Sequence, residues 1–277
     1  MSRITEKGAT GQIEVFTTST DTTLDTLCGS RYDTSDGRTF VLVQNGGSAL
    51  AAGKLVQSVP NTANHIGLTV VSFTAYSANG NVPAQVVLTC GGTGVLPGEY
   101  AGGYAIVSTG TGAGQTLKIA NNTGQTATTG NTTVTFENPD GQNMTALVAA
   151  SSTVSLFRNP YGSGNGGTAS TGVVNNSTNG VVINPTTTTG TIVGASVYPI
   201  AASSSTVPTY GLIQTNGLAA MLNHSGTTIG LNVGNSTQST PVAGAVETYS
   251  AANNTLVGYA VQAGTDTNYN LVNLQIG

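Results

Sequence analysis

The sequence predicts an all-β fold, and three observations carry that prediction. Short runs rich in Val, Ile, Leu, Thr and Tyr recur along the chain at the spacing of strands. Gly or Asn turns bound nearly every run, and 38 of the 277 residues are glycine. No segment keeps a 3.6-residue apolar period over three helical turns. We therefore expect a short-strand sandwich or barrel-like body, in one or two subdomains, with an extended N-terminal arm.

The first 37 residues differ in composition from the rest of the chain. Five of the seven Lys and Arg residues occur by residue 54, and residues 1–37 show little periodicity beyond one short apolar run. We interpret residues 1–37 as an extended, charged arm that ends at the turn Asp36-Gly37. Asp33 and Asp36 imitate half of a calcium loop, but the third acid and the distal Glu of such a loop are missing.

The body follows in two predicted β domains, residues 38–161 and residues 181–277. A Gly-, Ser-, Asn- and Thr-rich stretch at 162–180 separates them and is typical of a long loop or linker. We expect strands in the first domain at 38–44, 53–57, 68–76, 85–89, 104–107, 116–120, 132–136 and 153–157, with one helical turn at 48–52. We expect strands in the second at 180–183, 191–198, 228–233, 245–249, 256–262 and 269–276. Asn216-Gly217 predicts a type I′ hairpin between two further apolar strands within residues 210–222.

Composition excludes several classes of function. Only 6% of residues are charged, the net charge is −4, and seven Lys and Arg residues cannot easily build the basic stripe that nucleic acid requires. No run approaches the roughly 18 apolar residues of a membrane helix. The N-terminus has no apolar signal segment, so synthesis in the cytoplasm is expected. Cys28 and Cys90 have no metal-ligand spacing, and two free thiols are favoured over a disulfide.

Few residues are suited to catalysis. The two histidines are His65 and His224; His224 precedes Ser225, but the Gly-x-Ser-x-Gly elbow of a hydrolase is missing, and a plain turn is favoured. The sequence leaves open a carboxylate pair for glycoside cleavage among five acids, Glu99, Glu137, Asp140, Glu247 and Asp266. The glycine-rich stretches 110–114 and 162–167 imitate phosphate loops, yet no predicted helix follows either one. We expect no catalytic, cofactor-binding or metal-binding residues, and a cryptic hydrolase is the weakest hypothesis.

Several motifs, in this order along the chain, resemble a family of tailed-bacteriophage proteins. They are Asp36-Gly-Arg-Thr-Phe40, Val43-Gln-Asn-Gly-Gly-Ser-Ala-Leu-Ala-Ala-Gly-Lys-Leu-Val-Gln57, Glu99-Tyr-Ala-Gly-Gly-Tyr-Ala-Ile-Val107, Val154-Ser-Leu-Phe-Arg-Asn-Pro-Tyr161, Tyr210-Gly-Leu-Ile-Gln-Thr215, Gly244-Ala-Val-Glu247 and Val257-Gly-Tyr-Ala260. The chain resembles capsid decoration, or cement, proteins over residues 36–277. This resemblance implies an all-β body that oligomerises, often as a trimer, on the outside of the shell, with an N-terminal arm that crosses capsomer seams.

The first functional hypothesis is therefore a non-enzymatic virion protein on the outer capsid surface, which cements neighbouring major capsid subunits. The expected partners are the major capsid protein and further copies of this chain, in a homo-oligomer such as a trimer, with no cofactor. The candidate capsid contacts are the arm residues Arg3, Lys7, Glu14 and Arg31.

The alternative is a carbohydrate-binding or adhesive β module, such as a piece of a tail fibre or of a cell-surface protein. This alternative predicts an exposed aromatic cluster, for which Tyr198 and Tyr210 are the candidate pair.

Overall fold

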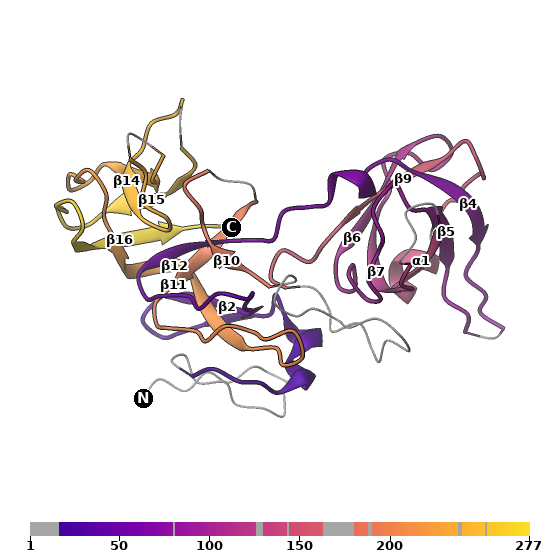
Figure 1. Cartoon of the computed structure of the whole chain (residues 1–277), viewed down its shortest axis with the longest axis horizontal. Coiled ribbons are helices and arrows are strands. Elements are labelled where there is room, and N and C mark those ends of the chain that lie inside the picture. Colours follow the sequence, from indigo (N-terminus) through magenta and orange to yellow (C-terminus); the bar gives the residue numbers. More distant parts are fainter. Residues whose placement is uncertain are drawn as a thin grey trace. The chain divides into compact units, whose positions relative to one another are not determined.

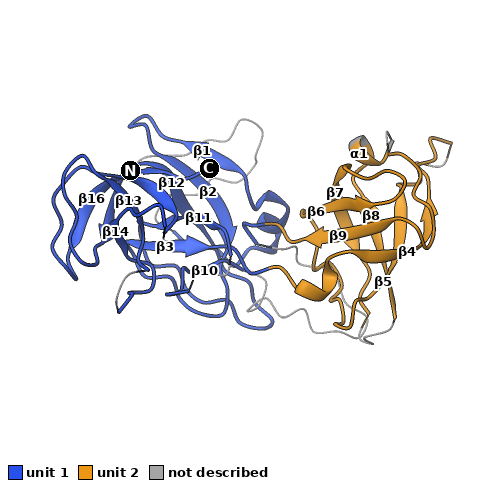
Figure 2. Cartoon of the chain, turned by 90° about the horizontal axis from the view of Figure 1, so that it is seen from above, with its two compact units in different colours: residues 1–60, 160–162, 175–277 blue, residues 61–159, 163–174 orange. Residues whose placement is uncertain are grey.

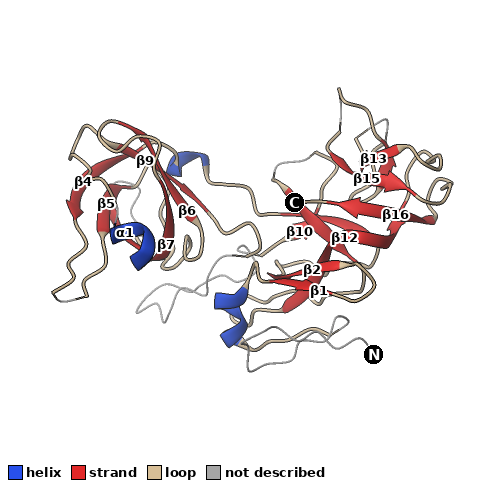
Figure 3. Ribbon diagram, turned by 180° about the vertical axis from the view of Figure 1, so that it is seen from behind, coloured by secondary structure: helices blue, strands red, loops and turns tan. Residues whose placement is uncertain are grey.

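A computed structural model describes residues 17–79, 81–125, 130–142, 144–162, 180–187, 190–237, 240–252 and 254–277. The chain divides into two compact units (Figure 2). Unit 1 contains residues 1–60, 160–162 and 175–277, and unit 2 contains residues 61–159 and 163–174. Strands dominate both units (Figure 3), which confirms the predicted all-β class.

Unit 2 is a closed antiparallel barrel in the order β4-β5-β8-β7-β6-β9. Its strands are β4 (Leu68–Thr74), β5 (Gln85–Thr89), β6 (Tyr104–Thr109), β7 (Thr116–Asn122), β8 (Asn131–Phe136) and β9 (Thr153–Phe157). A 3-10 helix at Ala63–His65 precedes the barrel, and α1 (Asn138–Gln142) follows β8. Alternate residues point inward, so Val86, Leu88 and Val134 join one apolar core, as a barrel requires.

Unit 1 is built on one ten-stranded sheet (Figure 1). Its elements are a 3-10 helix (Thr22–Leu27), β1 (Arg31–Asp33), β2 (Thr39–Gln44), β3 (Lys54–Gln57), β10 (Val182–Ile183), β11 (Ile192–Ser196), β12 (Tyr210–Leu222), β13 (Asn232–Asn235), β14 (Val246–Thr248), β15 (Leu256–Ala260) and β16 (Tyr269–Gln275). The strand order is β10-β3-β11-β12-β16-β15-β13-β14, and β2 pairs with both β1 and β12.

The hairpin predicted at Asn216-Gly217 is wrong, because β12 is one continuous strand of 13 residues. Its first part pairs with β2 and its second part with β16, and Asn216 stands opposite both Thr39 and Gln275. The register shifts between Gln214 and Asn216, and Gly217 has a φ of +88°. The Asn-Gly pair therefore forms a bulge in a long strand, because pairing with distant strands prevails over the local turn preference.

The structure divides the chain differently from the two consecutive domains predicted at 38–161 and 181–277. β2 pairs with β12, and β3 pairs with β11, so residues 38–57 belong with the C-terminal strands. The barrel of unit 2 is an insertion between these two parts of unit 1. Composition does not reveal the pairing of strands that lie more than 130 residues apart in the sequence. Most of the predicted linker at 162–180 lies outside the described residues.

The described part of the predicted arm, residues 17–37, packs on unit 1. The backbone of Ser19 exchanges two hydrogen bonds with that of Tyr210, at 3.0 and 2.7 Å. Asp21 caps the 3-10 helix by accepting from the backbone N–H of Thr23 at 2.9 Å, and Arg31 pairs with Val41 in the β1–β2 ladder. These residues are therefore part of the folded sheet, which differs from the arm predicted for 1–37.

The C-terminal strands of unit 1 curl into what we call the C-terminal half-barrel, which comprises β12, β16, β15, β13 and β14. The curl brings β14 back to the residues that follow β12, where Asn223 forms a parallel bridge with Val246. The N–H of His224 donates to the carbonyl of Val246 at 2.8 Å. The interior of the half-barrel is apolar and includes Ala219, Met221, Val233, Val257, Ala260, Val272 and Leu274.

Candidate interaction surface

The outward side of the C-terminal half-barrel is apolar as well. Side chains alternate between the two faces of a strand, so the inward residues Ala219 and Met221 leave Leu218, Ala220 and Leu222 pointing outward from β12. The same alternation on β16 buries Val272 and Leu274 and turns their neighbours outward. Both faces of residues 218–222 of β12 are therefore apolar, whereas the outward row of β16 is apolar at Leu271 and polar at Asn273. An antiparallel strand at a surface normally keeps one polar face.

The strand register gathers the outward side chains into one patch. Leu222 stands opposite Tyr269, Ala220 opposite Leu271, and Leu218 opposite Asn273, whose partner on β15 is Tyr259. Val261 follows β15 and donates its N–H to the carbonyl of Leu271 at 2.9 Å. We call this patch the outer face and define it as Leu218, Ala220, Leu222, Tyr259, Val261, Tyr269, Leu271 and Asn273.

The outer face exposes large apolar side chains and carries no charge among its eight residues. Leu218 is 49% exposed, Tyr259 37% and Tyr269 55%. Single exposed apolar residues are common on monomers, but a contiguous patch is typical of interaction sites. Aromatic side chains are enriched and charged ones depleted at the centres of protein interfaces.

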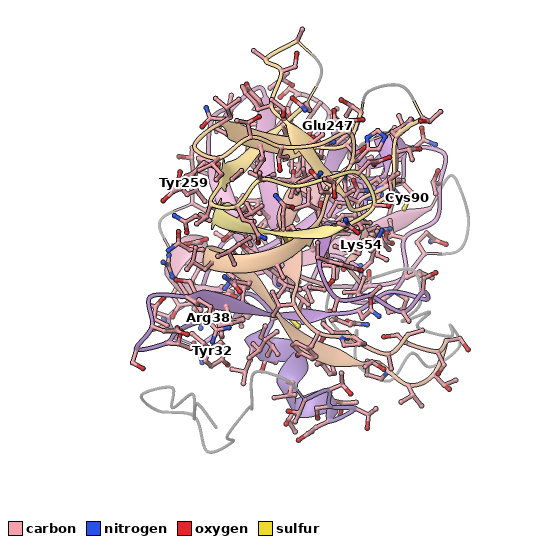
Figure 4. The ribbon with its side chains drawn as sticks, turned by 90° about the vertical axis from the view of Figure 1, so that its left-hand side faces the viewer. Tyr32, Arg38, Lys54, Cys90, Glu247 and Tyr259 are labelled. Carbon is pink, nitrogen blue, oxygen red and sulfur yellow. The ribbon has the colours of Figure 1, made fainter. Side chains whose placement is uncertain are left out.

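The two tyrosines of the outer face are held in place. Asn273 donates from Nδ2 to the hydroxyl of Tyr259 at 2.7 Å. The ring of Tyr269 lies against Gly53, where any side chain would collide with the ring. In Figure 4, Tyr259 lies at the periphery of the C-terminal strands. Rings fixed before binding lose little conformational entropy when a partner covers them.

The structure also gathers a polar cluster that the sequence did not predict as a unit. His224 Nδ1 lies 3.1 Å from Glu247 Oε2 and 2.8 Å from the hydroxyl of Ser236. The adjacent Ser225 has a φ of +62°, and its hydroxyl lies 3.3 Å from both ring nitrogens of His224 rather than in line with one of them. Asp266 accepts from the backbone N–H of Ser225 at 3.1 Å.

This cluster closes the seam of the half-barrel. A serine nucleophile requires one ring nitrogen as its base, with the acid on the other nitrogen. Here Glu247 and Ser236 both contact Nδ1, and Glu247 Oε1 also accepts from the N–H of Thr237 at 3.0 Å. His224 and Glu247 are both buried where β14 meets the end of β12. The cluster is arranged to satisfy buried polar groups at that seam.

The acids of unit 2 are likewise held in structural contacts. Glu99 is buried and forms an ion pair with Arg158, and its Oε2 accepts from the N–H of Leu96 at 2.8 Å. Asp140 accepts from the N–H of Lys118 at 2.6 Å, and Glu137 pairs with the Lys118 ammonium at 3.3 Å. The hydroxyl of the buried Tyr100 contacts Nδ1 of His65. These acids therefore fix loops of the barrel in place.

Of the four predicted capsid contacts, Arg3, Lys7 and Glu14 lie outside the described residues. Arg31 lies on β1 with its side chain 67% exposed, and its Nε is 3.4 Å from Asp33 Oδ1. The hydroxyl of Thr39 donates to Asp33 at 2.7 Å, and this bond is the main cause that lowers the pKa of Asp33. Arg31 thus remains available to a partner as an exposed cation.

The aromatic pair predicted for an adhesive site is wrong. Tyr198 is 6% exposed and Tyr210 1%, so neither ring can stack on a ligand. Burial raises the pKa of Tyr198 to about 12, and its hydroxyl donates to the carbonyl of Thr17 at 3.0 Å. The exposed rings of unit 1 that share one face are Tyr259 and Tyr269 instead. A strand apolar at both outward and inward positions, as in residues 218–222, was the signal for this face.

The remaining features that the sequence brings into question are metal sites, membrane helices, a disulfide and phosphate loops. Within them, no three His, Cys, Asp or Glu side chains gather where they could hold a metal ion. The described helices include none that is long and apolar enough to cross a membrane. Cys28 belongs to unit 1 and Cys90 to unit 2, and no disulfide joins them. Gly110, Gly112 and Gly114 have positive φ values in the connection between β6 and β7, a turn with no helix after it.

No known protein family, curated protein or solved structure matches this chain. The resemblance to tailed-phage decoration proteins therefore stays a prediction.

Proposed function

We propose that this chain is a non-enzymatic structural protein of a phage virion, which binds the outside of the capsid and cements neighbouring major capsid subunits. The observation that carries the proposal is the outer face, an uncharged apolar patch on the half-barrel strands. The proposed partners are the major capsid protein and other copies of this chain, and no cofactor is required.

The character of the outer face supports a protein partner. A small ligand needs a concave site that surrounds it, whereas the outer face lies on the outward side of a curled sheet. Its apolar side chains gain free energy when a partner removes them from water, at roughly 25 cal/mol per Å². The resemblance of residues 36–277 to decoration proteins makes the capsid the proposed location.

The polar clusters support a role without catalysis. The two histidines contact buried groups of their own units: His65 contacts Tyr100, and His224 contacts Glu247 and Ser236. A catalytic base needs access to a substrate proton, and both histidines are buried.

Binding to undecorated shells of the cognate capsid protein tests the proposal. We expect saturable binding of the full chain at hundreds of copies per shell, measured by co-sedimentation and densitometry. A variant that lacks residues 1–16 removes Arg3, Lys7 and Glu14 but retains every described residue, and we expect it to bind at least tenfold more weakly. Arg31→Ala should weaken binding less. The absence of shell binding by the full chain would reject the proposal.

The adhesive alternative is favoured by one observation, the two exposed rings of Tyr259 and Tyr269 on one face. They stand on neighbouring strands, and both side chains point outward. A glycan array tests this alternative. If the full chain binds a glycan but not the shells, and the double variant Y259A/Y269A loses glycan binding, the adhesive function would replace the capsid proposal.

A further inference from the structure

We propose that the outer face is a self-association site, in which a second copy of this chain packs its own outer face against the first around a two-fold axis. This two-fold contact differs from the trimer that the resemblance to decoration proteins implies. This inference rests on the proposed function, since it names the partner of the surface that the proposal uses. It commits to one occupant, and the capsid protein becomes an alternative outcome of the test.

Charge is the first argument for a second copy. A partner that placed a charge on the outer face would lose the hydration of that charge and find no opposite charge among the eight residues. The outer face itself satisfies this condition, because it contains five aliphatic side chains, two tyrosines and one amide, none of them charged. None of the eight residues is Lys, Arg, Asp or Glu, so two outer faces would meet without like-charge repulsion among these residues.

The strand register gives the second argument, which is self-complementarity. A two-fold contact requires that residue i meets residue j and that residue j meets residue i. The outer face has β16 at its centre, with β12 and β15 on either side. A two-fold axis along β16 would exchange these flanking strands, so that Leu218 faces Tyr259 of the second copy.

The same axis pairs small side chains with larger ones. Ala220 and Val261 occupy the row of Leu271 on opposite flanks, so Ala220 would meet Val261 of the second copy. Leu271 would meet its own counterpart near the axis. Two sheets packed in this way lie about 10 Å apart and keep their strands within about 30° of each other.

The size of the face sets the strength of the contact. It measures roughly 17 Å along the five residues of β16 from Tyr269 to Asn273 and roughly 15 Å across three strands. That area, on the order of 250 Å², is about a third of the ~800 Å² that each partner buries in a standard stable interface. We therefore expect a dissociation constant between about 10 µM and 1 mM. A shell that holds many copies side by side would raise the local concentration and fill these contacts.

Tryptophan fluorescence is a direct measurement, because the chain contains no Trp. In Leu271→Trp the probe stands at the proposed axis. In the control Val207→Trp it stands in unit 1 outside the outer face, where Val207 is 47% exposed. We expect the emission of Leu271→Trp to shift to the blue as the concentration rises from 1 µM to 1 mM. The control should keep its emission. Equal behaviour of the two probes would overturn the inference.

Charge complementation tests the pairing of Leu218 with Tyr259. Sedimentation velocity should show Leu218→Lys and Tyr259→Glu each as monomers at concentrations where the natural chain associates. A mixture of the two variants should form dimers, because the introduced ammonium of one copy would face the introduced carboxylate of the other. Both substitutions replace exposed side chains, and circular dichroism checks that each variant folds. A mixture that stays monomeric while the natural chain associates would overturn the two-fold arrangement.

Shell binding separates this inference from the proposed function. If the chain associates with itself in solution but does not bind shells, the inference is retained and the capsid role is rejected. Shell binding with a blue shift of Leu271→Trp at 1 µM, by a chain that stays monomeric at 1 mM, would assign the outer face to the capsid protein and overturn the inference.

Discussion

The two units contain curved antiparallel sheets of the same kind, yet their outward surfaces differ. In the barrel of unit 2, β8 and β5 turn Thr133, Thr135 and Gln85 outward, and Gln85 donates from Nε2 to the hydroxyl of Thr135 at 3.3 Å. Elsewhere on the barrel Lys118 pairs with Glu137.

In the half-barrel of unit 1, the outward positions of β12, β15 and β16 hold mainly Leu and Tyr, with Asn273 among them. Unit 2 also exposes apolar side chains, such as Val71 on β4 and Tyr104 on β6, but these two strands are not neighbours in the barrel. The half-barrel instead gathers its exposed Leu and Tyr side chains on three neighbouring strands.

This difference teaches that an apolar exterior is not a consequence of the fold. A barrel needs apolar residues inside, and Thr serves well on the outside because β-branched residues suit strands. The chain uses that solution on β8 of unit 2, at Thr133 and Thr135. The Leu and Tyr of the outer face therefore require a separate reason, and contact with a protein surface supplies one.

The largest effect is expected inside unit 2, at Arg158→Ala. This change leaves Glu99, whose side chain is 3% exposed, as a buried charge that has lost its ion-pair partner. Breaking a buried pair from one side costs about 3–5 kcal/mol of stability. Chemical denaturation followed by hydrogen exchange should show this loss in residues 61–159, while residues of unit 1 keep their protection. The control Arg31→Ala breaks an exposed pair and should change stability by less than about 1 kcal/mol.

Loss of protection in both units would contradict this prediction. It would show that the two units unfold together in one transition.

A second prediction compares the two sides of the half-barrel. Leu274 is buried in its interior and Leu218 lies on the outer face. Leu274→Ala should lower the free energy of unfolding by about 2–5 kcal/mol, because it removes buried methyl groups and leaves a cavity. Leu218→Ala should cost less than about 1 kcal/mol in dilute solution. Urea denaturation at low micromolar concentration measures both. Similar losses would mean that the outer face packs against the chain itself.

Much of this fold could be predicted from the sequence, because strands are local. The runs around residues 39–44, 85–89 and 269–275 alternate or are continuously apolar between turn residues, and each forms the expected strand. Pairing over long distances is not local. Asn216-Gly217 has the composition of a hairpin, yet two partners, β2 and β16, extend the strand through it.

The candidate surface was harder to predict for the same physical reason. Leu218 is far in the sequence from Tyr259 and Tyr269, and only the register of three strands brings the three residues to one face. Composition suggested Tyr198 and Tyr210 as exposed rings, but a tyrosine whose hydroxyl finds partners is readily buried. The Tyr198 hydroxyl contacts the backbone of Thr17 and Leu212, and that of Tyr210 contacts Asp25. The His224 and Glu247 contact also depends on the curl of the sheet rather than on a motif.

A third prediction transfers the surface of unit 2 to unit 1. The variant L218T/Y259T/Y269T gives the half-barrel a hydroxyl-rich exterior and keeps residues that favour strands. We expect its association at 1 mM to fall at least tenfold in equilibrium constant, while the midpoint of thermal unfolding at 1 µM moves by only a few degrees. Sedimentation equilibrium and calorimetry measure the two quantities. An unchanged association constant would show that the outer face does not mediate self-association. The apolar side chains of this face would then have no assigned function.

The smallest expected effect is a loss of stability at acidic pH, which we expect in unit 1 because of three of its aspartates. Asp21, Asp33 and Asp36 all belong to unit 1, and hydrogen bonds from Thr23, Thr39 and Thr34 respectively lower the pKa of each below its ordinary value of 3.8. A carboxylate whose pKa is lower in the folded state stabilises the fold above its unfolded pKa, and this contribution is lost as the pH falls through the folded value.

Unit 1 should therefore lose a small part of its stability between pH 4 and pH 2, and Thr39→Val should reduce that loss, because it removes the hydroxyl that donates to Asp33. Thermal unfolding at pH 7, 4 and 2 measures the effect, with Thr135→Val in unit 2 as the matched control. An acid response of Thr39→Val equal to that of the natural chain would show that the hydrogen bond from Thr39 to Asp33 does not contribute. The acid sensitivity of unit 1 would then have to reside in its other acids, which include Asp21 and Asp36.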